Sequence, residues 1–146
     1  MISSKIVFPI IELTDWVYEG ERIIEVEYKW TKLHYIKEKD FEKHHHRIII
    51  DSKGQILKVT GDKIIGKKGT LFSFIFPPTL VVEFNLELTN RIMTIEEVKR
   101  KIVSKSSKNF DITHNKLMTE TQYNSNVNAA KSFEELFKVA GFVDEN

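Results

Sequence analysis

Three of the five histidines in the chain stand together in the segment DFEKHHHRIIID, residues 40–51. If this segment is extended, alternate side chains share a face, and His44 and His46 lie on the same side as Asp40 and Glu42. Two imidazoles beside a carboxylate can bind Zn²⁺, Fe²⁺ or Mn²⁺. The pattern therefore predicts a site for a divalent transition metal with His44, His46 and Glu42 as ligands, in a metal-dependent enzyme or a barrel-like protein that binds a small ligand.

The same segment has a simpler interpretation as the rim of an ordinary strand. The isoleucines 48–50 would carry the strand into the core, and His45 would point to the opposite face. Short H-x-H matches arise often by chance, and a third ligand would have to come from elsewhere in the chain. On this interpretation the protein needs no cofactor.

A second group of candidate residues combines aromatic and acidic side chains. Trp16 and Tyr18 stand close to Glu19 and Glu21, and Tyr123 lies in a polar stretch near the C-terminus. Tryptophan and tyrosine are enriched at the energetic centres of protein interfaces. These five residues predict a surface that binds another protein.

A third group is basic. Lys67 and Lys68 stand between glycines, with Lys58 and Lys63 nearby. Glycine lets backbone amides approach an anion, so the basic hairpins could bind phosphate or RNA. The order of strand, glycine-rich loop and helix that defines a P-loop is missing, and a solvated hairpin tip explains the same residues.

Composition restricts the class of protein. The 146 residues suit one domain, 1–146, and 41% hydrophobic with 29% charged residues is globular composition. The absence of cysteine excludes disulfides and thiolate chemistry. A net charge of +1 is too small to argue for a nucleic-acid or membrane partner, so we expect no membrane partner and regard nucleic acid as the less favoured one. The first residues resemble no signal peptide, and no apolar run approaches a membrane span. We expect a soluble, cytoplasmic protein of bacterial type.

The elements that would position these residues are strands first and helices last. Alternating apolar residues and turn signals within 5–90 predict about seven strands. Capping boxes at Thr94 and Ser132 predict helices over 94–105 and 132–141, with a long polar loop over 104–131 between them. This order predicts an α+β domain in which a mainly antiparallel, curled sheet precedes two C-terminal amphipathic helices.

No set of residues in the sequence forms a coherent catalytic group. The sequence therefore favours a small non-enzymatic protein that binds another protein, such as an inhibitor or an immunity-like factor. The metal-dependent or ligand-binding alternative and the phosphate- or RNA-binding alternative stay open.

Overall fold

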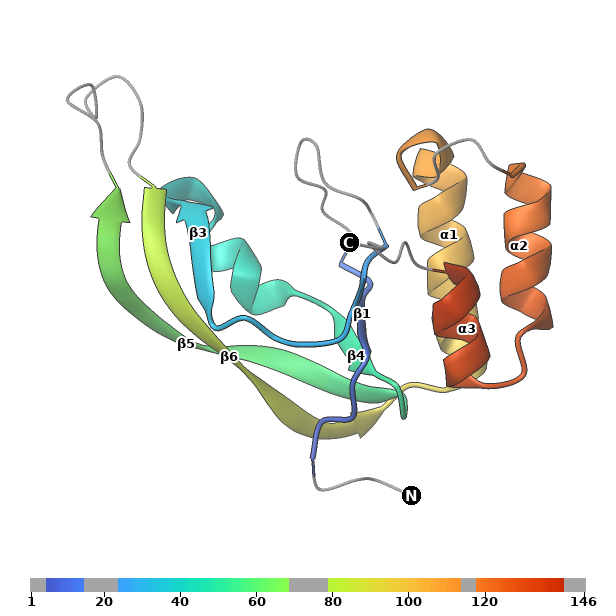
Figure 1. The fold of residues 1–146 in the computed structure, drawn as a ribbon, viewed down its shortest axis with the longest axis horizontal. Helices are drawn as coiled ribbons and strands as arrows, with labels where there is room; N and C mark the ends of the chain where they lie inside the picture. The colour runs from blue at the N-terminus through green and yellow to red at the C-terminus, as the bar shows by residue number, and fades with distance from the viewer. Residues whose placement is uncertain (1–4, 15–23, 69–78, 114–117, 141–146) are drawn as a thin grey trace.

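A computed structural model describes residues 5–14, 24–68, 79–113 and 118–140, and Figure 1 shows their arrangement. Within these ranges the side chains of Lys68 and of residues 106–113 are not described. A curled antiparallel sheet occupies one side of the molecule, and helices gather at the other. The predicted α+β class is confirmed.

The described part of the chain forms one sheet of six strands, against the seven or so that the sequence predicts. Their order is β2-β1-β4-β5-β6-β3, and every neighbouring pair is antiparallel. The strands are β1 (Ile10–Glu12), β2 (Val26–Glu27), β3 (Leu33–Lys37), β4 (Ile49–Asp51), β5 (Gln55–Lys68) and β6 (Thr79–Ile92).

The longest elements are β5 and β6, which pair over 14 residues each and curve away from the helices (Figure 1). The sequence predicts a second hairpin turn at Gly61 and Asp62, and this prediction is wrong. Gly61 does have the positive φ, 77°, that a turn would require, but it lies at a register shift inside β5, so the strand bulges and continues. The central strand expected over 70–76 lies outside the described residues.

Three α-helices follow the sheet: α1 (Ile95–Thr113), α2 (Glu120–Ala129) and α3 (Phe133–Ala140). The predicted polar loop over 104–131 is therefore wrong for most of its length, because α1 extends to residue 113 and α2 lies within it. Thr119 and Gln122 form a capping box that starts α2. Tyr123 and Val127, four residues apart, are buried on the inner face of this otherwise polar helix.

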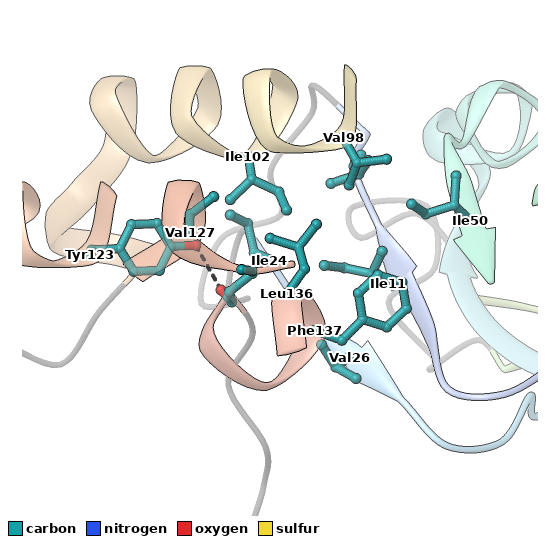
Figure 2. Close-up of a cluster of buried hydrophobic side chains, with 13 residues drawn as sticks. Ile11, Ile24, Val26, Ile50, Val98, Ile102, Tyr123, Val127, Leu136 and Phe137 are labelled. Carbon is teal, nitrogen blue, oxygen red and sulfur yellow. Dashed lines mark hydrogen bonds between the residues drawn. The ribbon is translucent and has the colours of Figure 1, made fainter. Parts of the chain in front are cut away.

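The two faces of the sheet belong to two separate cores. Ile11 and Ile50 face the helices and pack with residues such as Val98 and Leu136 (Figure 2). Their neighbours in sequence point the other way, into a second core with Leu57, Val82 and Phe84. The members of this second core that come from β1 and β4 are Ile10 and Ile49.

A buried carboxylate lies at the end of β4, beside both cores. Asp51 Oδ1 accepts hydrogen bonds from the backbone amides of Lys53 and Gln55, each at 2.9 Å. Its Oδ2 accepts from Gln55 Nε2 at 2.7 Å and from the Val7 amide at 3.0 Å. Asp51 thus ties the turn between β4 and β5 to the segment that precedes β1.

Candidate functional site

The histidine segment folds differently from the extended strand that the metal prediction requires. Residues Glu38–Asp40 and Glu42–His46 form two short 3-10 helices, η1 and η2. A 3-10 helix has about three residues per turn, so residues two apart do not share a face. His44 is only 4% exposed, whereas His46 and Glu42 face solvent. The expected alignment of His44, His46 and Glu42 is therefore wrong, and the described residues contain no group of three histidines or acids placed to hold a metal ion.

His44 instead belongs to a ring cluster inside the second core. Its imidazole stacks on Phe84 with ring centroids 5.2 Å apart and an interplanar angle of 14°. The His34 imidazole, from β3, meets the His44 ring edge-on at 6.0 Å and the Phe84 ring at 5.4 Å. Trp30 covers the His34 ring at 4.8 Å. We call these four residues the ring cluster, and its contacts hold η2 against the sheet.

Burial in this cluster lowers the pKa of both imidazoles. The pKa of His44 falls to about 4, first because burial disfavours the charged ring and then because the Arg47 guanidinium and the His34 ring lie nearby. The pKa of His34 is lowered for the same first reason, with Arg47 again contributing. Both rings are therefore neutral at pH 7 and act as packing groups.

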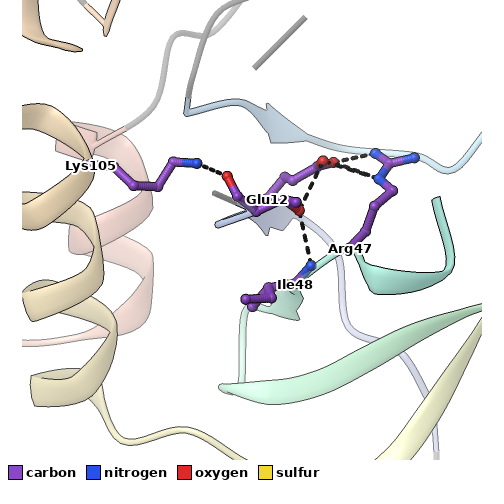
Figure 3. Close-up of polar contacts among 5 residues, drawn as sticks. Glu12, Arg47, Ile48 and Lys105 are labelled. Carbon is purple, nitrogen blue, oxygen red and sulfur yellow. Dashed lines mark hydrogen bonds and ion pairs between the residues drawn. The ribbon is translucent and has the colours of Figure 1, made fainter. Parts of the chain in front are cut away.

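The charge of Arg47 is compensated by an acid from β1. Figure 3 shows Arg47 reaching Glu12, whose carboxylate accepts from Arg47 Nε at 3.0–3.1 Å and also from Nη2. The guanidinium also lies 5.2 Å from the centre of the Trp30 ring, which is cation-π geometry. On the other side of β1, the buried Lys105 of α1 donates to the carbonyl of Thr14. These polar contacts join η2, β1 and α1, so their role is structural.

The residues predicted to bind a protein partner have different placements. Trp16, Tyr18, Glu19 and Glu21 lie outside the described residues. Tyr123 is fully buried between the helices, and its hydroxyl donates to the Ala140 carbonyl at 2.7 Å, so its ring packs in the core and presents no surface to a partner.

The basic hairpin residues lie on β5, where acids of β6 face some of them. Lys67 is exposed, and the side chain of Lys68 is outside the described set. Lys58 lies 4.0 Å from the Glu87 carboxylate. Lys63 pairs in register with Glu83. The neighbouring carboxylates reduce the positive charge that this hairpin could offer to phosphate.

A surface that none of the sequence predictions included lies on the far half of the sheet. We call it the distal ribbon: β3 with residues 58–68 of β5 and 79–87 of β6. Leu33 pairs with Glu83 and Tyr35 pairs with Val81, so these four side chains point to the same face of the sheet. Ile36 points to the opposite face, where it is buried in the second core. Leu33 is 43% exposed and Tyr35 60%. The three α-helices lie at the other end of the sheet (Figure 1).

Exposed apolar side chains also occur on β5, which β6 separates from β3. Ile64 and Ile65 of β5 are 49% and 47% exposed, at the register shift that precedes Gly66. Ile64 pairs with Val82 and therefore lies on the face opposite to Leu33 and Tyr35. A signal for this surface was present in the sequence, because His34 and Ile36 alternate with Leu33 and Tyr35, so that both faces of β3 carry large side chains. The sequence does not show which of these two pairs faces solvent. The structure does, because His34 packs inward in the ring cluster.

Comparisons with protein-family models, curated proteins and solved structures gave no match to this chain. Among the helices that the structure describes, none combines the length and the apolar character needed to cross a membrane. The candidate site therefore stands on its own geometry.

Proposed function

We propose that this protein binds another protein through the outer face of the distal ribbon, in the manner of an inhibitor or an immunity-like factor. The observation that carries the proposal is the pair of exposed large side chains on the outer face of β3, Leu33 at 43% and Tyr35 at 60%. Apolar side chains grouped on one surface commonly mark a protein interface, whereas isolated ones need no explanation.

The strand pairing also suits a protein partner. Among the described strands, β3 pairs only with β6, and residues 58–68 of β5 likewise pair only with β6. An edge of this kind presents backbone donors and acceptors to which an extended segment of a partner can add. The lysines on β5, including Lys58, Lys63 and Lys67, oppose non-specific pairing at that edge, and β3 carries only one lysine, Lys37. We therefore place the partner over β3 and the adjoining outer face.

The experiment uses a matched pair of tyrosines. Tyr35 on β3 and Tyr28, in the connection before β3, are equally exposed, at 60% and 61%. A photo-crosslinking amino acid at either position, introduced in cells, should give a discrete adduct from position 35 and none from position 28. The crosslinked protein is then identified, purified and titrated against the wild type, Tyr35→Glu and Tyr28→Glu.

The expected result is that Tyr35→Glu weakens binding of the purified partner by tenfold or more, because it places a charge in a desolvated apolar contact. Tyr28→Glu should bind like the wild type. Equal binding by all three proteins, or equal crosslinking from both positions, would remove the distal ribbon as the binding surface.

A further inference from the structure

A cavity of about 430 Å³ lies between α1 and the end of β6, away from the distal ribbon. Its lining combines apolar and charged side chains: Ile56, Arg91, Ile92, Met93, Glu97, Arg100, Lys101 and Ser104. We call it the bulge cavity. Its volume is within the range of about 300–1,000 Å³ that is typical of sites for small molecules.

An irregularity in β6 places Arg91 in this lining. Leu57 pairs with Leu88, but the preceding residue, Ile56, pairs with Arg91, so β6 contains two extra residues at this point. One of them, Asn90, has a φ of 63°, a left-handed conformation that asparagine tolerates better than most residues. Bulges commonly redirect a side chain at a functional site, and this one brings Arg91 beside Ile56 at the cavity.

The bulge is held in place by a threonine side chain. The Thr89 hydroxyl donates to the Ile56 carbonyl at 2.7 Å and accepts from the Arg91 amide at 3.2 Å. The neighbouring chain is fixed as well, since the Met93 amide donates to the Gly54 carbonyl at 2.7 Å. The sheet side of the cavity is therefore a built structure, although Arg91 itself faces solvent.

The helix side of the cavity is a single stripe of α1. Glu97, Arg100, Lys101 and Ser104 follow the spacing i, i+3, i+4, i+7, which places them on one face of a helix. The adjacent face of α1, with Val98 and Ile102, is buried in the first core. Packing of that face fixes the rotation of α1 and so keeps the charged stripe beside the cavity.

The charges of the lining are unbalanced. Among the described residues, none of Arg91, Arg100 and Lys101 takes part in an ion pair within 4.0 Å. The one acid of the lining, Glu97, is engaged in the capping box, where its carboxylate accepts from the Thr94 amide at 2.8 Å. Three cations and one carboxylate leave the lining with a net charge of +2.

The opposite part of the lining is apolar. Ile92 is 56% exposed although it is a large aliphatic side chain, and Ile56 and Met93 are partly buried beside it. An inorganic anion alone would leave these side chains in contact with water. A ligand with an apolar body and an anionic end would cover them and bring its charge to the arginines, whose guanidinium groups match a carboxylate with two parallel hydrogen bonds.

We infer that the bulge cavity binds a small organic monocarboxylate with an apolar body. The net charge of +2 attracts the anionic end of such a ligand. Arg91 and Arg100 bind the carboxylate, Lys101 adds positive potential, and Ile56, Ile92 and Met93 contact the apolar body. This site is separate from the proposed protein interface, because Ile56 and Arg91 lie at the opposite end of β5 and β6 from the part of the sheet that pairs with β3.

The test is a titration of the full chain, labelled with ¹⁵N, at constant ionic strength. Three probes separate the contributions: 4-phenylbutyrate, its uncharged analogue 4-phenylbutanol, and inorganic phosphate. We expect 4-phenylbutyrate to shift the amides of residues 91–93 and 97–104 in a saturable manner, and the other two probes to bind at least tenfold more weakly. An equal response to 4-phenylbutanol or to phosphate would overturn the assignment, as would the absence of saturation with all three.

Two exposed single-charge variants complete the test. Arg100→Gln removes a cation from the lining, and Lys131→Gln removes one from the exposed connection between α2 and α3. We expect Arg100→Gln to raise the Kd for 4-phenylbutyrate at least fivefold and Lys131→Gln to leave it unchanged. Equal affinity in both variants would show that general charge, and no specific site, causes the binding.

Discussion

Acidification should destabilise the fold through the buried imidazole of His44. Its pKa is about 4 in the folded protein and about 6.5 in the unfolded chain, so the unfolded state binds a proton first as the pH falls. The stability that depends on the neutral ring is therefore fully present above pH ~6.5 and is lost progressively between pH ~6.5 and pH ~4. Across that whole window the loss amounts to about 3 kcal/mol, a large part of the stability of a typical small domain.

The assay is urea unfolding followed by tryptophan fluorescence at pH 7.5 and pH 4.5, with His44→Leu as the variant and His46→Leu as its control. Leucine cannot titrate, so the drop in the free energy of unfolding between the two pH values should be about 2–3 kcal/mol smaller in His44→Leu than in the wild type. His46 is exposed on the same 3-10 helix, and His46→Leu should follow the wild type. His34, whose pKa is lowered in the same direction, is retained in both variants.

The pH dependence is the quantity to compare, because His44→Leu also changes packing against Phe84 and so shifts the stability at every pH. If the free energies of the wild type and of His44→Leu run parallel from pH 7.5 to pH 4.5, the burial argument for His44 is refuted.

Three further substitutions test the packing of the fold. Tyr123→Phe should lower the free energy of unfolding by about 1–2 kcal/mol, because it removes the donor to a buried carbonyl at the end of α3; an unchanged urea midpoint would contradict this role. Gly54→Ala should destabilise strongly, since a methyl group there would lie 2.7 Å from both the Met93 carbonyl oxygen and the Phe133 ring at a φ of 79°. Gly61→Ala, with a similar φ but a nearest contact at 3.3 Å, should cost less, and a reversed order in thermal unfolding would disprove the comparison.

The parts of the fold that local sequence patterns encode were predictable. Strict alternation through Leu80, Val82 and Phe84 predicted β6, and the pair Thr94 and Glu97 predicted the start of α1, where both capping hydrogen bonds form. These signals are local, because a strand face or a helix cap needs only residues close in sequence.

Other parts depend on distant contacts that no local pattern records. α2 is rich in Asn, Gln, Ser and Thr and reads as a loop, yet burial of Tyr123 and Val127 against α1 and α3 makes it a helix. His44 reads as a metal ligand until Phe84, forty residues away, is seen to stack on it. The position of Arg91 depends on a bulge for which Asn90, a residue that tolerates positive φ, is the one local sign.

Because β1 and β4 are buried on both faces, hydrophobic burial contributes little to setting their pairing register. In a sheet buried on one face, a slip of one residue exposes the apolar side chains and is penalised at once. Here Ile10 and Ile11, like Ile49 and Ile50, would merely exchange cores, so hydrophobic burial alone distinguishes poorly between the two alignments. Asp51 contributes to the distinction, because its Oδ2 accepts from the Val7 amide, in the segment before β1, only in the observed alignment. Its other three donors belong to Lys53 and Gln55, within four residues of it. A buried polar group thus helps to set the pairing of two strands whose apolar side chains do not set it themselves.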